Sequence, residues 1–298
     1  MDIQYVATRF YDYLTHIKGY SKETIRRYKY VINLYCKISN ISSLQQVSPT
    51  NVRGLFYHGR TERKWAPNTF IIFHKSLKVF FRYCIEQGLM RENPLNDLEK
   101  PKVEFKIPVK LTKQEALRLL ELIYNFPKWD RYLRARNHAL FSTFVHAGLR
   151  RSELIHLQYS DVDLDNHTIF VRQGKGAKDR MIPISPALAV TLHRYTDERN
   201  KAHKSCPEFF ASSKADKGIT LDGLKHLIDQ VCRITGVKFS SHKLRHTFAT
   251  LMLEGGCDIY SLSKMMGHTD IKTTTIYLSA SIEHLRTQID KHPLNWAV

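Results

Sequence analysis

The sequence predicts a mainly α-helical protein of two domains, in which the N-terminal domain has four helices and the C-terminal domain is mostly helical with a small antiparallel sheet. Apolar residues recur at helical spacing through most of the 298 residues. Two short runs rich in β-branched and apolar residues, 168–172 and 181–184, flank a glycine-rich turn and are typical of a β-hairpin. A chain of this length suits two domains better than one small core.

The N-terminal domain is predicted over residues 1–94. Its first helix is indicated by apolar residues three or four apart, namely Ile3, Val6, Phe10 and Leu14. Ser21 is expected to cap a second helix, and Ser48 followed by Pro49 a third, because hydroxyl N-caps and a proline at the first helical position favour a helix start. A fourth helix is expected over 67–87.

Residues 95–110 lose the helical periodicity and contain two prolines among several lysines, so they are predicted to form an extended linker. The C-terminal domain is predicted over residues 111–298. Its first helix begins with Thr112 and has Glu115 three residues later, the pattern of a capping box. Further helices are expected over 132–146, 186–201 and 221–234, and a brief strand over 208–210.

The charge of the chain indicates its partner. The formal net charge is +18, the sequence pI is about 9.7, and both predicted domains share the excess of Lys and Arg. Two basic domains suit a clamp on a polyanionic duplex. Candidates for phosphate contacts lie in the second helix, where basic residues alternate with tyrosines, and in the loop 59–65: Arg26, Arg27, Lys29, Arg60, Arg63 and Lys64. Each of these alone would equally suit a solvated helix face.

The cysteines and the hydropathy limit the cellular setting. The five cysteines are scattered and form no C-x-x-C pair, which favours a reducing, cytoplasmic location and argues against a structural zinc site. The N-terminus lacks the cationic start and apolar core of a secretory signal, and no apolar run approaches the length of a membrane span. No membrane partner is therefore expected.

The residues suited to phosphodiester chemistry gather near the end of the chain. They are His242, Arg245, His268 and Tyr277. A helix expected over 242–253, with Ser241 as its N-cap, places the first two on one face. Arginine binds phosphate oxygens, histidine moves protons near neutral pH, and tyrosine can become covalently attached to its substrate. His242 and His246 are spaced like a metal pair, but no Glu follows His242 as in H-E-x-x-H, so no metal is predicted.

These residues, in HKLRHTFAT and MMGHTDIKTTTIYL, resemble the C-terminal box of the tyrosine recombinases, the phage integrase and Xer family. In that box H-x-x-R is followed by a Gly-His pair and, nine residues after this His, by the nucleophilic Tyr. Here His268 and Tyr277 are nine apart. The resemblance extends to GLRRSEL (148–154), to the hairpin GKGAKDR (174–180), and more weakly to YSKETIRRY and GLMRENPLNDLEKPK, which are similar to the family's SAM-like core-binding domain.

The resemblance implies a catalytic set, which in this sequence is Arg150, Lys175, His242, Arg245, His268 and the nucleophile Tyr277. It implies that the two arginines clamp the phosphate and that Lys175 is the general acid for the departing 5′ oxygen. His242 is interpreted as acceptor or relay of the tyrosine proton, and Glu153 as a supporting residue that orients Arg150 or His242. Lys178 and Arg180 are expected either to contact the DNA backbone or to solubilise the turn.

The implied activity is site-specific recombination, in which duplex DNA is cut and rejoined through a 3′-phosphotyrosyl intermediate by four protomers on two duplexes. A covalent intermediate conserves bond energy, so no cofactor and no ATP are expected. Ile282, Leu285 and Ile289 form an apolar stripe in the C-terminal segment 281–298, expected to pack on its own domain or to dock into a neighbouring protomer.

Two alternatives stay open, a type IB topoisomerase and a DNA-binding architectural protein without activity. The sequence does not decide the target DNA site, the need for an accessory protein, or the biological role among chromosome-dimer resolution, element integration or excision, and cointegrate resolution.

Overall fold

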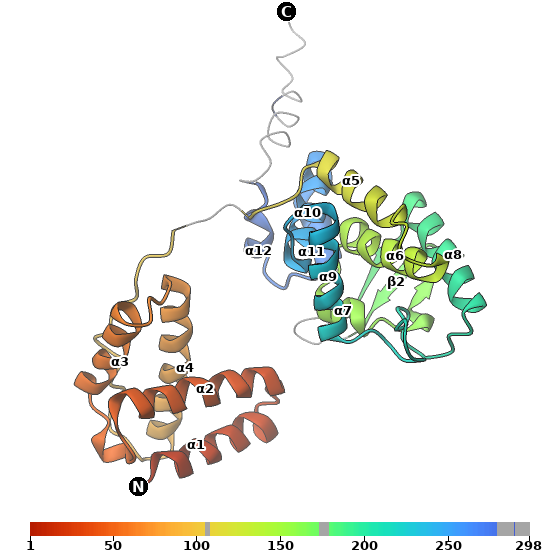
Figure 1. The fold of residues 1–298 in the computed structure, drawn as a ribbon. Coiled ribbons are helices and arrows are strands. Elements are labelled where there is room, and N and C mark those ends of the chain that lie inside the picture. The colour runs from red at the N-terminus through yellow and green to blue at the C-terminus, as the bar shows by residue number, and fades with distance from the viewer. Residues whose placement is uncertain (105–107, 173–178, 279–288, 290–298) are drawn as a thin grey trace, which may run out of the picture. The chain divides into compact units, whose positions relative to one another are not determined.

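The computed structural model describes residues 1–104, 108–172, 179–278 and 289. It comprises two compact units, Met1–Phe105 and Lys106–Val298 (Figure 1). Each unit has a hydrophobic core of its own. The mainly helical fold with a small antiparallel sheet is confirmed. None of the helices in the described part of the chain is both long and apolar enough to cross a bilayer.

The first unit packs its helices around an aromatic core. The helices are α1 (Ile3–Asp12), α2 (Lys22–Ser39), α3 (Pro49–Thr61) and α4 (Pro67–Glu86). The predicted caps are confirmed, because the Ser21 hydroxyl accepts the Thr24 N–H and the Ser48 hydroxyl accepts the Asn51 N–H. The largest fully buried side chains of this core are Phe10, Tyr35, Phe56, Phe80 and Phe81.

Helix α3 meets the loop that follows it at Gly59. The Trp65 ring packs 4.0 Å from the Phe73 ring between centroids, and the Trp65 N–H donates to the Gly59 carbonyl at 2.8 Å. A Cβ on Gly59 would lie 2.2 Å from Cε3 of Trp65. Glycine is therefore required here by the close approach of the indole.

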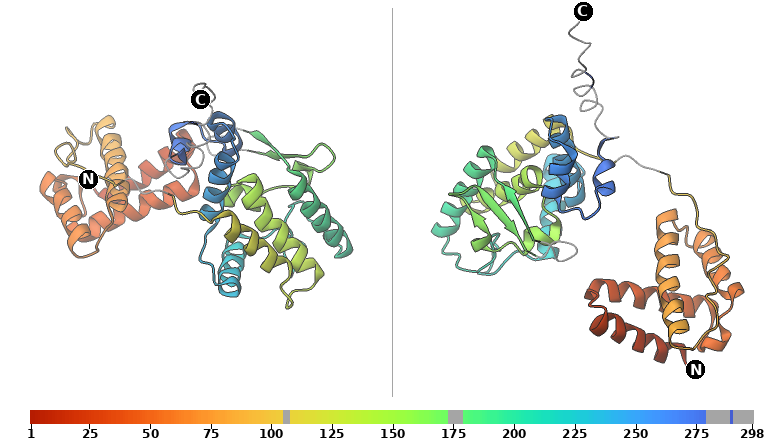
Figure 2. Two further views of the ribbon diagram at one scale, coloured as in Figure 1. Left: turned by 90° about the horizontal axis from the view of Figure 1, so that it is seen from above. Right: turned by 180° about the vertical axis from the view of Figure 1, so that it is seen from behind.

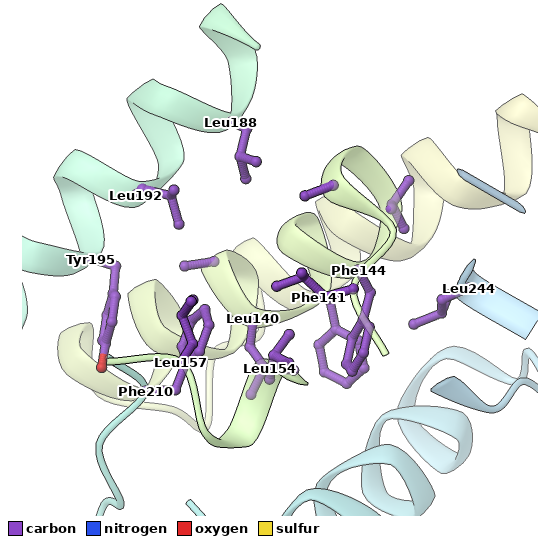
Figure 3. Packing of buried hydrophobic residues seen from close by; sticks show 14 of the residues in the cluster. Leu140, Phe141, Phe144, Leu154, Leu157, Leu188, Leu192, Tyr195, Phe210 and Leu244 are labelled. Atoms are coloured by element: carbon purple, nitrogen blue, oxygen red, sulfur yellow. The ribbon is translucent and has the colours of Figure 1, made fainter. Parts of the chain in front are cut away.

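The second unit is built around one central helix. Its helices are α5 (Lys113–Tyr124), α6 (Arg131–Ala147), α7 (Arg151–Ile155), α8 (Pro186–Lys201), α9 (Leu221–Thr235), α10 (Ser241–Glu254), α11 (Ile259–Met266) and α12 (Lys272–Thr275). Helix α6 contacts α5, α8 and α10, and its residues Leu140, Phe141 and Phe144 are fully buried. Leu192 of α8 and Leu244 of α10 point toward these side chains (Figure 3).

A three-stranded antiparallel sheet lies along one side of these helices (Figure 2). Its strands are β1 (Val162–Asp163), β2 (Thr168–Val171) and β3 (Arg180–Pro183), in the order β1-β2-β3. Ile169 pairs with both Val162 and Ile182, and the side chains of Ile169 and Ile182 are buried. The sequence predicted β2 and β3 but missed the two-residue β1, which is too short to show a periodicity.

Two local expectations are corrected. Ser240, not Ser241, caps α10, because its hydroxyl accepts the Lys243 N–H and the helix starts one residue earlier. The strand expected at 208–210 is reduced to isolated bridges, of Gln158 with Glu208 and of Ala211 with Gly218. The other predicted elements are confirmed to within a few residues, except that α3, which was expected to end at Phe56, continues to Thr61.

The predicted linker 95–110 is only partly described. Leu95 is buried in the core of the first unit. Lys110 forms an ion pair with Glu254 of α10, and the Leu111 N–H donates to the Thr247 hydroxyl at 2.9 Å. The chain therefore enters the second unit in contact with α10.

The two glycines of α3 give a matched test of the Trp65 contact. Gly59→Ala is expected to lower the free energy of unfolding of the first unit by about 1–3 kcal/mol, because the methyl group must displace the indole. Gly54→Ala meets nothing within 4 Å, so it should raise the stability by about 0.5–1 kcal/mol through helix propensity. Hydrogen exchange of the buried α4 amides measures both effects. Equal changes in the two variants would contradict this account.

Candidate active site

A buried carboxylate lies among the candidate residues that the sequence motifs single out. Glu153 of α7 has a side chain that is 5% exposed. It accepts hydrogen bonds from both terminal nitrogens of Arg180, at 2.9 and 2.7 Å. It also accepts from Nη1 and from the backbone N–H of Arg150, both at 2.7 Å. Four charge-assisted hydrogen bonds therefore satisfy a single carboxylate.

These bonds keep Glu153 ionised. Burial by itself would raise the pKa of the carboxyl, but the hydrogen bonds and charge of Arg180, together with the hydrogen bonds from Arg150, outweigh it. They lower the pKa of Glu153 from 4.5 to about 2. The negative charge is thus present throughout the physiological range and holds the two guanidinium groups in place.

The same two arginines also bind the turn at the end of α11. Nη2 of Arg150 donates to the Gly267 carbonyl, and Nε of Arg180 donates to the Met265 carbonyl, both at 2.8 Å. Gly267 has φ +62°, and a Cβ there would lie 2.8 Å from Nη1 of Arg180. Only glycine combines this backbone conformation with so close a guanidinium, which explains why Gly precedes His268.

Arg245 of α10 is the third guanidinium group near Glu153. Its side chain is buried and donates to the carbonyls of Gly148 and Met266. Nη1 lies 3.9 Å from Glu153 Oε2. Burial, and after it the charge of Arg150, lower the pKa of Arg245 to about 10, so the group remains a cation at neutral pH.

His268 is held as a neutral imidazole. Burial, followed by the charges of Arg245 and Arg150, lowers the pKa of His268 to about 4. Its Nε2 lies 3.2 Å from Arg245 Nη2, and its Nδ1 lies 2.8 Å from the Thr274 hydroxyl. Because arginine can only donate, Nε2 is the acceptor and Nδ1 carries the hydrogen toward Thr274.

Tyr277 lies in a small apolar cluster next to these groups. It is 2% exposed and packs with Phe248, Leu253, Leu262 and Met266. Its hydroxyl lies 2.8 Å from Nδ1 of His246, which follows Arg245 on α10. Burial raises the pKa of Tyr277, and the charges of Arg245 and Arg150 offset only part of this rise. The phenol is therefore protonated at neutral pH.

His242 occupies the first turn of α10 and is exposed. Partial burial, and then the charges of Arg151 and Arg245, lower the pKa of His242. Among the hydrogen bonds of the described residues, the Tyr277 hydroxyl is joined to His246, one turn farther along α10. From the sequence alone, His246 was interpreted only as half of a metal-like pair with His242. Its position four residues after His242 was a usable signal, because such residues share a helix face.

Of the three candidates in the hairpin, only Arg180 belongs to the described residues. Lys175 and Lys178 lie outside the described residues. Arg180, expected at the DNA backbone or in solvent, has a side chain that is 9% exposed and bonds both Glu153 and Met265. Its role as the partner of Glu153 was missed, since the hairpin pattern alone gives no long-range pairing.

The candidates in the first unit are mostly surface cations. Arg26, Arg27 and Lys29 are exposed on α2, and Arg63 and Lys64 on the loop after α3. Arg27 lies over the Tyr28 ring, Lys29 lies over the Tyr11 ring, and Arg60 donates to the Trp65 carbonyl. Cations held over tyrosine rings keep their charge available at the surface.

The Glu153 network gives a pH-dependent stability. Because its pKa is depressed when folded, Glu153 stabilises the second unit above pH 4.5, and this contribution is lost as the pH falls toward about 2. We expect Glu153→Gln to lose about 3 kcal/mol of unfolding free energy at pH 6 and less at pH 3. Hydrogen exchange of buried α6 amides in urea measures the difference.

Glu198→Gln serves as the control for this experiment. Its carboxylate pairs with Lys201, which is 70% exposed, and such pairs contribute about 0–1 kcal/mol. A Glu153→Gln effect that is as small as that of the control, or that is the same at both pH values, would contradict the role of the buried carboxylate.

Comparisons with known proteins place the chain in a family. Residues 110–284 match the family described as "Phage integrase family", and residues 7–90 match "Phage integrase, N-terminal SAM-like domain". Over 97% of this chain and 95% of the relative, it is 33% identical to tyrosine recombinase XerA of Thermococcus kodakarensis. It is 28% identical to tyrosine recombinase XerC of Chlamydia caviae, over 95% of this chain and 97% of that protein.

A solved structure has the same fold. The XerH site-specific recombinase, in a post-cleavage complex with a palindromic difH substrate, superimposes with a TM-score of 0.73 at 20% identity, covering 96% of this chain and 84% of that one. The family match spans more than half of the chain, and it includes the segments that carry Arg150, Arg245, His268 and Tyr277. The chain belongs to the phage integrase family, the tyrosine recombinases.

Proposed function

We propose that this chain is a site-specific DNA recombinase, which cleaves and rejoins duplex DNA through a 3′-phosphotyrosyl intermediate on Tyr277. One observation carries the proposal. Two guanidinium groups, Arg150 and Arg245, and the neutral His268 are tied together through Glu153 and the Gly267 turn, and the charges of both arginines act on the buried Tyr277. The family match favours this function over the topoisomerase and the architectural protein.

The cleavage step follows from the charges at the site. A phosphodiester under attack gathers negative charge on its non-bridging oxygens, and Arg150 and Arg245 supply fixed cations for them. The Tyr277 oxygen bonds to phosphorus as the bond to the 5′ oxygen breaks. Lys175 gives a proton to that oxygen, a role that is supported by the match of the hairpin GKGAKDR to the family pattern. Attack by a new 5′ hydroxyl reverses these steps, so no cofactor and no metal are required.

Both units contribute to DNA binding in this proposal. Residues 1–94 form the core-binding domain, with Arg26, Arg27, Lys29, Arg60, Arg63 and Lys64 on the phosphate backbone. The linker 95–110 leads to the catalytic domain 111–298. Exposed cations on α2 and the match to the SAM-like domain support this division. The cysteines described as free thiols support a reducing, cytoplasmic location.

Assembly into a tetramer on two duplexes is the further part of the proposal. Helices α5 and α10 border an apolar groove of about 440 Å³, whose lining includes Ala116, Leu117, Leu120, Phe248, Leu251 and Met252. The apolar stripe of the C-terminal segment is suited to this groove on a neighbouring protomer. Of this stripe the structure describes Ile289, which is 65% exposed, whereas Ile282 and Leu285 lie outside the described residues. Docking of this kind couples the active sites of adjacent protomers.

The nucleophile is tested with a nicked duplex that traps the covalent intermediate. The wild-type protein, incubated with a duplex that carries a candidate site, is expected to give a covalent protein–DNA band on a denaturing gel. Tyr277→Phe is expected to give no band, because phenylalanine has no oxygen to attack phosphorus. Tyr260→Phe is the control, since Tyr260 is 60% exposed on α11, and it should match wild type. Because the assay contains only the purified chain and DNA, a covalent band from wild type would also show that cleavage needs no accessory protein. A covalent band from Tyr277→Phe would contradict the assignment of Tyr277 as the nucleophile.

The assembly role of the tail is tested by deletion. Removing residues 281–298 should weaken cooperative assembly on paired sites more than binding to one site, measured by gel shift. Leu117→Lys should have the same effect, because it places a charge in the groove and Leu117 is 58% exposed, so folding is spared. Equal losses of single-site binding and assembly would argue against docking between protomers.

A further inference from the structure

The hydrogen bond between Tyr277 and His246 has no role in the cleavage step described above. The two residues meet at 2.8 Å between the phenol oxygen and Nδ1, with their ring centroids 5.5 Å apart and the ring planes at 51°. His246 directly follows Arg245 on α10. One helix therefore supplies both a phosphate-binding guanidinium and the partner of the nucleophile, which fixes their relative positions.

The protonation states decide which group donates. Burial, and after it the charges of His242 and Arg245, lowers the pKa of His246, so its imidazole is neutral at pH 7. The phenol keeps its proton, because burial raises the pKa of Tyr277. The phenol O–H therefore donates to Nδ1 of His246, and the imidazole hydrogen resides on Nε2.

We propose that His246 is a catalytic residue, which holds the Tyr277 hydroxyl through Nδ1 and accepts its proton when the oxygen attacks phosphorus. This inference rests on the proposed recombinase function. The new bond joins the tyrosine oxygen to phosphorus, the phenol O–H bond breaks with its proton passing to Nδ1, and the 5′ oxygen departs and is protonated by the general acid. In rejoining, the imidazolium returns the proton to the phenol oxygen as it leaves phosphorus.

The surroundings make this transfer depend on bound phosphate. A positive imidazolium next to Arg245 is disfavoured in the free protein, so Tyr277 stays protonated and weakly nucleophilic. A phosphodiester bound by Arg150 and Arg245 adds a negative charge that offsets these cations. His246 then becomes a better base at the moment when an electrophilic phosphorus is present.

His242 is the competing acceptor, and the geometry separates the two histidines. His242 is exposed in the first turn of α10, whereas His246 is half-buried and already bonded to the phenol oxygen. His242 is free to contact a phosphate oxygen from the open end of the helix. Of the two histidines on this helix face, it is therefore His246 that contacts the nucleophile.

The first test needs no DNA. In nitrogen NMR of the free protein with labelled histidine, His246 should be in the Nε2–H tautomer, and Tyr277→Phe should shift the His246 Nδ1 resonance but not that of His193, which is exposed on α8. The opposite tautomer at His246, or an unchanged resonance, would overturn the assignment. This result is independent of whether the chain recombines DNA.

The second test separates holding the phenol from taking its proton. Asn places an amide oxygen near the position of Nδ1, so His246→Asn can accept the hydrogen bond but not the proton. We expect the rate of covalent complex formation to fall about 100-fold or more, and His193→Asn to leave it unchanged. Added imidazole should restore part of the rate in His246→Ala. A wild-type rate in His246→Asn would overturn the proton-accepting role.

A substrate with sulfur in place of the bridging 5′ oxygen assigns the defect to one side of the reaction. A thiolate leaves without a proton, so this substrate should restore Lys175→Ala but not His246→Asn. Rescue of both variants would contradict a role for His246 at the nucleophile. If wild type itself formed no covalent complex with any of these duplexes, the recombinase function would fail, while the tautomer measurement would still judge the Tyr277–His246 bond.

Discussion

The buried carboxylate of Glu153 is the interaction on which the rest of the site depends. It accepts hydrogen bonds from Arg150 and Arg180, which in turn bind the carbonyls of Gly267 and Met265. Without its negative charge, three guanidinium groups would repel one another at short range in a desolvated place. One carboxylate thus allows an excess of positive charge to persist where a phosphate can bind.

This arrangement separates the groups that bind charge from the groups that move protons. The arginines remain cations, because even Arg245 keeps a pKa of about 10 despite its burial. The same cations and the same burial keep His268 neutral. Burial also keeps the Tyr277 phenol protonated. On the proposed function, the resting site is ready to bind a phosphodiester, and Tyr277 becomes reactive only when that anion is bound.

The sequence predicted most of the longer helices, the hairpin strands and the family, because these depend on local periodicity, caps and motif spacing, but it did not predict α11 and α12. Thr112 with Glu115 is a local signal of this kind, and its capping box is confirmed. Contacts across the chain were not predictable in the same way. Arg180 and Glu153 are joined by folding alone, and the His246–Tyr277 bond requires α10 and the segment after α12 to meet. The roles of Lys175 and of the C-terminal stripe remain predictions.

Mass spectrometry of the trapped protein–DNA complex tests the central claim most directly. After nuclease and trypsin digestion, the nucleotide phosphate should be found on the peptide of residues 273–286, whose only tyrosine is Tyr277. We expect a phosphotyrosyl bond at that residue, with the DNA attached through its 3′ end. A nucleotide on another peptide, or a 5′ attachment, would contradict it.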